Sequence, residues 1–190
     1  MWYNLFSGAY NAAARKMCED CKEFIKKGSR ILDLGCGSAI ASKAFKDYFQ
    51  ADVFGVDVVD RRVVSIPFRI IEGRLLPFAD DSFDAVLIAY VLHHSEDPVF
   101  LLKEVKRVAK DKIFIYEDLS EGFISKLFCE LHGLSFDSFF HNKNKTIFKT
   151  GKEWEEVFKE LGLKLVFQKR VSSSLNPVEK KLFVLEKMRA

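Results

Sequence analysis

Apolar segments of two kinds alternate along this chain, and their alternation limits the possible folds more than any other feature. Short runs rich in Val, Ile, Leu and Phe predict strands, and longer segments with helical periodicity separate them. Strands that alternate with helices predict an α/β fold, a doubly wound and mostly parallel sheet. The last two strand-like segments alternate apolar and polar residues with no helix between them, which predicts an antiparallel closing strand.

The pattern predicts seven strands and five helical segments. The expected strands are 30–34, 52–58, 68–73, 83–92, 112–118, 163–170 and 181–188. Helices are expected at 9–27, 97–109, 121–134 and 150–162, and another follows the first strand with apolar positions Ile40, Ala44, Phe45 and Tyr48. The helix at 97–109 should place Phe100, Leu101, Val105 and Val108 on one face. Thr150 and Glu153 have the spacing of a capping box, and Gly162 lies where that helix should end.

Length and composition predict a single soluble domain over residues 1–190, of which 1–28 form an N-terminal helical segment. With 48% hydrophobic and 30% charged residues the chain is typical of globular proteins. Its net charge of +3 gives no reason to expect a nucleic-acid partner. Residues 141–190 hold 12 Lys and Arg against 6 Asp and Glu, either a solvated surface or a site for an anionic partner.

The cysteines and the apolar segments indicate a cytoplasmic protein. The first residues are aromatic and lack the basic start of a signal peptide, and no apolar run is long enough to predict a membrane span. Cys18 and Cys21 form a CxxC pair, but no second pair or His pair follows at zinc-finger spacing. We therefore expect no metal, and interpret the two thiols as small residues on a helix.

The stretch "RILDLGCGSAI", residues 30–40, predicts a ligand site. Gly35 and Gly37 directly follow an expected strand, so a ligand can approach the backbone where the next helix begins. Asp57 ends the second expected strand, 20 residues after Gly37, where a carboxylate can accept hydrogen bonds from two ribose hydroxyls. The pattern therefore predicts a ligand with a ribose.

Two features argue against a dinucleotide. The third glycine of that fingerprint is absent, because Ser38, Ala39, Ile40 and Ala41 follow Gly37. Asp33 stands two residues before Gly35, where a carboxylate would repel phosphates and attract an ammonium group. S-adenosylmethionine combines a ribose, an amine and a carboxylate, and it is the cofactor we expect.

Three motifs in order then carry a specific resemblance. The segment "ILDLGCGSAI" resembles motif I of class I S-adenosylmethionine-dependent methyltransferases, and "VFGVDVV" resembles their second motif. "IIEGRLLPFADDSFDAVLIAYVLHHSEDPVFLLKEVKRV" is similar to the pattern of the small-molecule branch, methyltransferase type 11, which includes ubiquinone and menaquinone C-methyltransferases. The resemblance covers residues 30–118 and implies a Rossmann-like methyltransferase fold.

The resemblance also implies roles for single residues at the cofactor. It implies that Asp33, Gly35, Cys36 and Gly37 hold the methionine part, that Asp57 binds the ribose, and that Glu72 and Gly73 contact the adenine. Ala89 is a further expected cofactor contact, and the N-terminal segment 1–10 could close the other side of the site with Tyr10 near the cofactor. Glu72 stands where the family usually has Asp, and Arg74 departs from the usual small or acidic residue, so its role stays open. Phe78 and Phe83 are expected in the core and Asp84 as a structural cap.

The acceptor side is expected after the fourth and fifth strands. His94 and His93 are candidate catalytic bases, because an imidazole titrates near neutral pH, although both could simply be hydrogen-bonded in a turn. Tyr90 and Glu117 are candidate substrate contacts. The Phe- and Leu-rich segment 119–150 could roof an apolar acceptor as a substrate cap, or be an ordinary packed helix pair.

The sequence thus predicts methyl transfer to a small molecule, and three alternative functions were considered. "AYVLHH" replaces the Asn-Pro-Pro-Tyr-like or Pro-Cys motif of nucleic-acid methyltransferases, and the paired glutamates of protein arginine methyltransferases are missing. A catalytically silent subunit that binds S-adenosylmethionine and acts through a partner protein is the remaining alternative. The motifs identify the cofactor and leave the acceptor and the methylated atom open.

Overall fold

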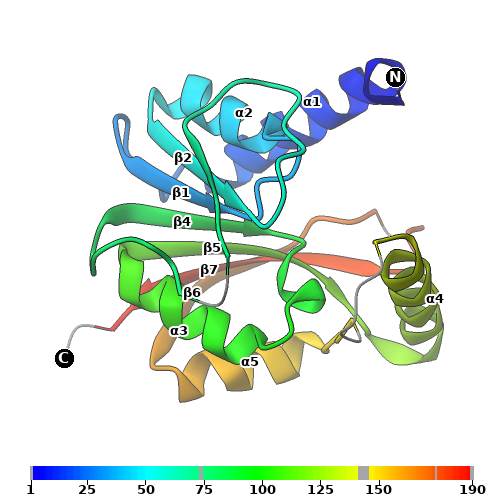
Figure 1. Cartoon of the computed structure of the whole chain (residues 1–190). Helices are drawn as coiled ribbons and strands as arrows, with labels where there is room; N and C mark the ends of the chain where they lie inside the picture. Colours follow the sequence, from blue (N-terminus) through cyan, green and yellow to red (C-terminus); the bar gives the residue numbers. More distant parts are fainter. Residues whose placement is uncertain (1, 73–74, 141–145, 174, 189–190) are drawn as a thin grey trace.

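The computed structural model describes residues 2–72, 75–140, 146–173 and 175–188. They form one sheet in the order β3-β2-β1-β4-β5-β7-β6 (Figure 1). The strands are β1 (Arg30–Leu34), β2 (Asp52–Asp57), β3 (Phe68–Ile70), β4 (Phe83–Ala89), β5 (Ala109–Leu119), β6 (Leu163–Arg170) and β7 (Glu179–Lys187). The helices are α1 (Trp2–Cys21), α2 (Ile40–Phe49), α3 (Pro98–Val108), α4 (Gly122–Phe140), α5 (Gly151–Glu160) and the short 3-10 helix η1 (Leu92–His94).

The pairing of the strands confirms the predicted fold class. β3, β2, β1, β4 and β5 pair in parallel, whereas β7 pairs antiparallel with both β5 and β6. β7 is therefore the antiparallel closing strand of a seven-stranded, mostly parallel sheet. β6 and β7 follow each other closely in sequence, and a short connection without a helix between them permits only an antiparallel pair.

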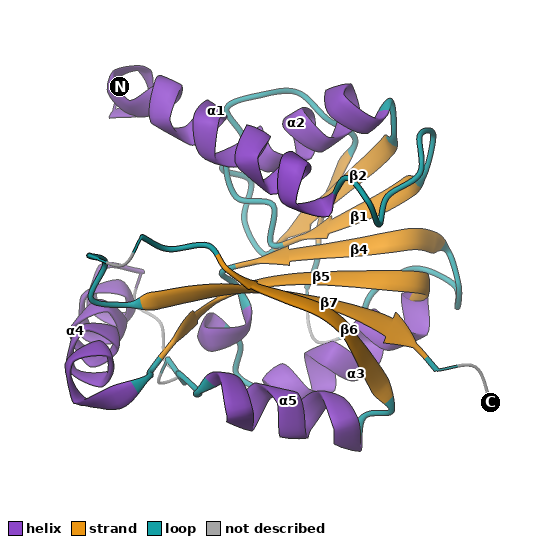
Figure 2. Ribbon diagram, turned by 180° about the vertical axis from the view of Figure 1, so that it is seen from behind, coloured by secondary structure: helices purple, strands orange, loops and turns teal. Residues whose placement is uncertain are grey.

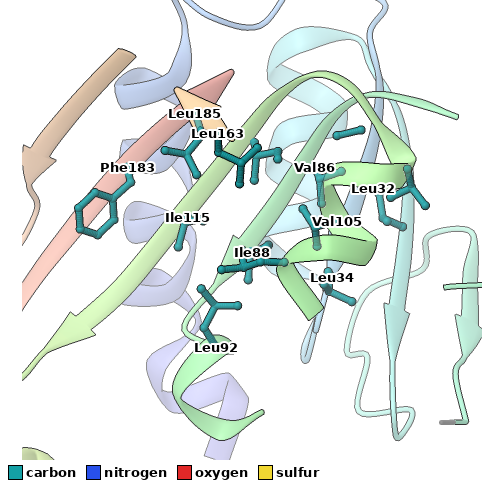
Figure 3. Packing of buried hydrophobic residues seen from close by; sticks show 14 of the residues in the cluster. Leu32, Leu34, Val86, Ile88, Leu92, Val105, Ile115, Leu163, Phe183 and Leu185 are labelled. Atoms are coloured by element: carbon teal, nitrogen blue, oxygen red, sulfur yellow. The ribbon is translucent and has the colours of Figure 1, made fainter. Parts of the chain in front are cut away.

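Helices cover both faces of the sheet, which explains why the central strands are apolar without alternation. α1 and α2 lie on one face, and α3 and α5 lie on the other (Figure 2). Figure 3 shows the second of these layers, where Leu32, Val86, Ile115 and Phe183 from four neighbouring strands pack together with Val105 of α3. Burying one such side chain stabilises the fold by about 1.5–3 kcal/mol.

Several expected boundaries and faces are wrong in detail. The first helix covers Trp2–Cys21 instead of 9–27, because Phe24 has to leave the helix axis to contact the rings of Phe114 and Phe167. The third strand ends at Ile70 instead of residue 73, and the helix expected at 121–134 covers Gly122–Phe140.

The helix faces also differ from the expected ones by one position. α2 buries Phe49 while Tyr48 is 40% exposed, and α3 buries Leu102 while Phe100 and Leu101 are only half-buried. Adjacent apolar residues leave the buried face of a helix ambiguous, and contact with the sheet selects one of them. The capping box of Thr150 and Glu153 is present as predicted.

The order of the sheet fixes where a ligand can bind. β1 lies between β2 and β4. The connection that follows β1 therefore leads to strands on one side of β1, and the connection that follows β3 leads back to strands on its other side. A parallel sheet opens a crevice at such a switch point, beyond the carboxyl ends of the strands. The glycine stretch follows β1 at this point, and Tyr90 follows β4.

Candidate active site

The loop between β1 and α2 leaves open space at its second glycine. Gly35 and Gly37 both have positive φ angles, 72° and 49°, which favour glycine. A Cβ on Gly35 would lie 2.4 Å from a methyl carbon of Val91, so that position is closed by packing. A Cβ on Gly37 would meet nothing within 4 Å, and the loop is therefore open to a ligand there.

The amide groups of this loop are arranged by β2. Gly35 and Cys36 donate to the carbonyl oxygen of Val56, at 2.8 and 3.1 Å. The Cys36 side chain is buried against Ile66 and close to Gly55, so only its backbone can face a ligand. α2 begins after Ala39, which has a φ of 62° and provides no side-chain cap, so the first turn of the helix can receive an anionic group.

Asp57 joins the end of β2 to the glycine loop. Its carboxylate accepts a hydrogen bond from the amide of Gly37 at 2.8 Å and another from the amide of Val58 at 2.7 Å. The two bonds fix the carboxylate beside the open side of the loop while its side chain stays partly exposed. A carboxylate held in this way can accept hydrogen bonds from a ribose diol.

Asp33 is a buried carboxylate beneath the same loop. It is 2% exposed and accepts a hydrogen bond of 2.5 Å from the hydroxyl of Ser42 on α2. Burial raises the pKa of Asp33 to about 6; the bond from Ser42 lowers it, and the nearby Asp57 raises it. A cationic ligand group beside Asp33 would favour its ionised form.

Replacing Asp33 by Asn is expected to stabilise the cofactor-free protein at neutral pH by about 1–2 kcal/mol. The raised pKa means that the folded protein binds this proton more tightly than the unfolded chain. The wild-type protein should therefore lose stability as the pH rises from about 4 to about 6, and the variant should not. Urea unfolding at several pH values measures the difference. Asp52→Asn is the control, because Asp52 is exposed. Equal stability of Asp33→Asn and wild type at neutral pH would contradict the prediction.

The segment after β3 carries Glu72 and is held by a partly buried ion pair on α3. Glu72 is exposed and lines a hollow of about 240 Å³ with Arg69, Ile70, Ile71, Leu75 and Pro77. Gly73 and Arg74 lie outside the described residues. Glu104 of α3 accepts from the amide of Leu76, and Arg107 donates to Glu104 and to the carbonyl of Leu76.

This clamp between α3 and the segment was missed in the sequence. Glu104 and Arg107 stand three residues apart on one helix, a spacing at which side chains meet, but the spacing does not reveal a loop as the third partner. Phe83 is fully buried in the core, as predicted, and the half-buried Phe78 packs against the core with its ring edge to face with Phe83. Asp84 accepts from the amide of Arg30 and so joins β4 to the start of β1.

Tyr90 follows β4 in an unusual backbone conformation. Its φ is 59°, which is rare for a bulky residue and is often found at functional sites. The amide of Tyr90 donates to the carbonyl of Tyr116 at 2.8 Å, and the ammonium group of Lys180 lies 4.6 Å from the centre of its ring. Burial raises the pKa of the Tyr90 phenol, and Asp118 and Glu117 raise it further. The phenol is therefore held neutral beside the end of the strand.

His93 and Glu117 form a buried pair that joins η1 to β5. Nδ1 of His93 contacts Oε1 of Glu117, and the two side chains are 1% and 0% exposed. Oε1 also accepts from the amide of Asp118, whereas Oε2 has no hydrogen-bond partner among the residues that the structure describes. Neither side chain reaches an open space in this conformation, and their roles in catalysis and acceptor binding stay predictions.

The segment that follows α4 covers this pair. The Phe148 ring stacks on His93 with 4.8 Å between ring centroids and 19° between planes. The amide of Ile147 donates to the carbonyl of His93 at 2.8 Å. His94 is half-buried beside them, with its ring centroid 4.0 Å from that of His93. The sequence segment 119–150 thus returns to the carboxyl end of β4, which the spacing along the chain did not reveal.

The remaining expected site residues are Ala89 and Tyr10. Ala89 ends β4 and is half-buried against the core on the α1 and α2 side. Tyr10 is on α1 and 55% exposed. α1 packs against α2, and its first half extends past the sheet on the side to which the parallel strands point (Figure 1).

The CxxC pair is part of the core. Cys18 and Cys21 are fully buried, and Cys21 is 3.3 Å from the hydroxyl of Tyr116. Burial raises the pKa of each thiol to about 12, so both stay protonated at neutral pH. Within the described part of the chain, no group of three or more His, Cys, Asp or Glu side chains could hold a metal ion.

Protein purified without added metal is therefore expected to contain no stoichiometric zinc. Zinc binds thiolates, and forming two of them in this core would cost their burial energy and disturb the packing. Elemental analysis measures the content, with Cys129→Ser as control because Cys129 is buried elsewhere. One zinc per chain that disappears in Cys18→Ser would contradict the prediction.

Together, the switch-point crevice, the open glycine loop and the carboxylates at the ends of β1 and β2 define a class of enzyme that binds an adenosine-containing ligand in a Rossmann-like sheet. A methyltransferase-domain family matches residues 32–115. A Methanocaldococcus jannaschii relative, the uncharacterized protein MJ1123, is 33% identical over 150 residues, which is 77% of this chain and 69% of the relative. The chain belongs to the S-adenosylmethionine-dependent methyltransferases, and S-adenosylmethionine is its cofactor.

Other comparisons agree with this family. The demethylmenaquinone methyltransferase of Renibacterium salmoninarum is 37% identical over 90 residues, 44% of this chain and 38% of that protein, so the chain matches well under half of its length. A solved complex between the Haloferax volcanii Trm112 methyltransferase activator and a methyltransferase matches this chain with a TM-score of 0.72 and 20% identity, covering 97% of this chain and 96% of that one. This similarity shows the shared fold. No helix in the described ranges is long and apolar enough to cross a membrane.

Proposed function

We propose that this enzyme transfers a methyl group to a small-molecule acceptor of apolar or aromatic character in the cytoplasm. The observation that carries the proposal is the arrangement beyond β4, where Val91 packs against Gly35 of the glycine loop and the His93–His94 pair contacts Phe148 of the segment that follows α4. Apolar walls with a few polar groups are typical of sites for small organic ligands.

The cofactor site in this proposal uses the carboxylates and the glycine loop. The Asp33 carboxylate pairs with the ammonium group of the cofactor. The backbone of Gly35, Cys36 and Gly37 contacts its methionine part. Asp57 accepts hydrogen bonds from the ribose hydroxyls. The open space at Gly37 and the buried carboxylate of Asp33 support this fit. Glu72 and Gly73 are assigned to the adenine end of the cofactor. Ala89 and Tyr10 are assigned to the edge of the cofactor site.

Methyl transfer from this cofactor requires few catalytic groups from the protein. When bound, S-adenosylmethionine supplies an electrophilic methyl group on a sulfonium sulfur. The chain's residues hold the acceptor close to it, and correct positioning alone contributes up to about 7–11 kcal/mol to such reactions. A base is needed only when the attacking atom carries a proton that must leave, and His94 is the residue we assign to that step.

The acceptor side is supported by what surrounds His94. The Tyr90 ring lies 6.4 Å from that of Tyr116 and packs on the α1 and α2 side of the sheet, whereas the His94 ring lies against His93, on which Phe148 stacks. The Renibacterium relative is named for a quinone acceptor, which supports an aromatic or apolar compound as the class to test first.

The experiment is a turnover assay with isotopically labelled S-adenosylmethionine. Purified protein is incubated with demethylated quinols, other hydroxylated aromatics, and polar amines of similar size, and the labelled product is identified. Methylation of compounds from the first two groups at rates above those with the amines supports the proposal. Turnover restricted to the polar amines, or to a protein or nucleic acid, would contradict it.

A silent binding subunit is the second candidate, favoured by one observation. The Haloferax structure with the same fold is a complex with an activator protein. If this chain works in that way, the isolated protein binds S-adenosylmethionine without turnover, and activity appears only with a partner. Turnover by the isolated chain would rule it out.

A further inference from the structure

Helix α2 buries one polar side chain on a face that is otherwise apolar. Its buried residues are Ile40, Ser42, Phe45 and Phe49, and Ser42 is 0% exposed. A buried hydroxyl costs free energy unless it forms a hydrogen bond, and alanine favours a helix more than serine does. Packing and helix propensity therefore do not explain the serine, and the reason for it lies in the hydrogen bond that it forms.

That hydrogen bond joins the first turn of α2 to β1. The hydroxyl of Ser42 donates to Oδ2 of Asp33 at 2.5 Å, which leaves Oδ1 of Asp33 for a ligand. Serine hydroxyls in helices commonly bond back to a carbonyl of the same helix, and here the hydroxyl bonds to another element instead. In the sheet Asp33 pairs with Gly55 of β2 and Leu87 of β4, and neither side chain carries a charge or a donor.

The surroundings of Asp33 oppose its ionisation in every other respect. Burial raises its pKa to about 6, and the carboxylate of Asp57 raises the pKa further. The thiol of Cys36 in the glycine loop has a pKa raised to about 12 and stays neutral at physiological pH. Within the described part of the chain, the hydroxyl of Ser42 is the group that lowers the pKa of Asp33 and so favours its charged form.

We propose that Ser42 is a positioning residue for the cofactor, because its hydroxyl keeps Asp33 ionised and oriented toward the ammonium group of S-adenosylmethionine. This role rests on the proposed assignment of that ammonium group to Asp33. A proton on Asp33 competes with the ammonium group for the same carboxylate, so cofactor affinity falls as the pH falls through the pKa of Asp33. Ser42 thereby sets the pH at which the fall begins.

The test is calorimetry on the full chain at several pH values, with S-adenosylmethionine and with methylthioadenosine, which keeps the adenosine and the sulfur but lacks the amino-acid part. Wild-type affinity for S-adenosylmethionine should fall about tenfold from about pH 7 to about pH 5. Ser42→Ala should move this fall up by about one pH unit, which weakens binding about fivefold at about pH 6 and hardly at about pH 8. Affinity for methylthioadenosine should depend neither on pH nor on Ser42.

Two further variants separate this role from a general effect on the fold. Ser29→Ala is the matched control, because Ser29 bonds to the carbonyl of Lys26 just before β1 begins, at the other end of that strand. It should follow wild type at every pH. In Asp33→Asn, affinity for S-adenosylmethionine should no longer change with pH over this range, and Ser42→Ala in that background should bring no pH-dependent loss.

Each contrary outcome has a distinct meaning. A Ser42→Ala protein that binds like wild type, or whose loss is the same at every pH, would overturn the positioning role. A loss shared by methylthioadenosine would also overturn it, because the effect would then lie at the adenosine. An Asp33→Asn protein that binds S-adenosylmethionine like wild type at every pH would instead refute the assignment of the ammonium group. None of these measurements involves an acceptor, so the turnover assay tests the acceptor class independently.

Discussion

Replacing His94 with alanine is expected to lower the turnover rate by about 10²–10⁴-fold if the acceptor's proton leaves through this imidazole. His94 ends η1, directly beyond β4 at the carboxyl edge of the sheet, and its ring lies against that of His93. Affinity for S-adenosylmethionine should change little, because the cofactor is assigned to the ends of β1 and β2. Steady-state kinetics and calorimetry on the same preparation measure both quantities.

The control is His93→Ala, and it should behave differently. His93 is 1% exposed and paired with Glu117, so its removal leaves a buried carboxylate without that partner and should mainly lower the melting temperature. A His94→Ala protein whose Michaelis constant rises at unchanged turnover would mean that His94 orients the acceptor. Loss of cofactor binding in a folded His94→Ala protein would place the histidine in the cofactor site and contradict the prediction.

Replacing Asp57 with alanine is expected to weaken S-adenosylmethionine binding by about 1.5–3 kcal/mol, roughly 10- to 150-fold. The ribose hydroxyls lose charge-assisted hydrogen bonds, and the amide of Gly37 loses the acceptor that fixes the loop. Calorimetry with S-adenosylmethionine and with S-adenosylhomocysteine should show similar losses, because the two ligands share the ribose.

The control for this prediction is Asp60→Ala. Asp60 lies three residues further along, is exposed, and bonds to Arg62 instead of the glycine loop. Its removal should leave cofactor affinity unchanged. Asp57→Asn should fall between alanine and wild type, since an amide oxygen accepts without the charge. Unchanged affinity in Asp57→Ala would show that the ribose is bound elsewhere.

Much of the sheet could be predicted because burial leaves a local signature. β1 covers Arg30–Leu34 as expected, and the apolar run of β4 reflects its cover by helices on both faces. The antiparallel strand β7 followed from the lack of a helix before it. Helix boundaries were less accurate, because Phe24 leaves α1 for contacts with strands that come much later in the chain.

Some features of the candidate site could also be predicted from the sequence, and others could not. The residue types of the glycine loop and Asp57 were visible in the sequence, because a backbone approach requires glycine and a diol requires an acceptor. The bond from Ser42 to Asp33 and the clamp from Glu104 and Arg107 to Leu76 were not visible. Each joins groups whose contact depends on how a helix is rotated against its neighbours.

The sequence by itself determined the α/β class, the motifs of a methyltransferase and the residues available to its cofactor, since these depend on residue type and short spacing. Only the tertiary structure decided that His93 is buried against Glu117 and covered by Phe148, and that α4 turns its small residues inward and its large ones outward. The physical reason is that the contacts of His93 join residues 24 and 55 positions apart, and that packing between whole elements determines which face of a helix such as α4 turns inward.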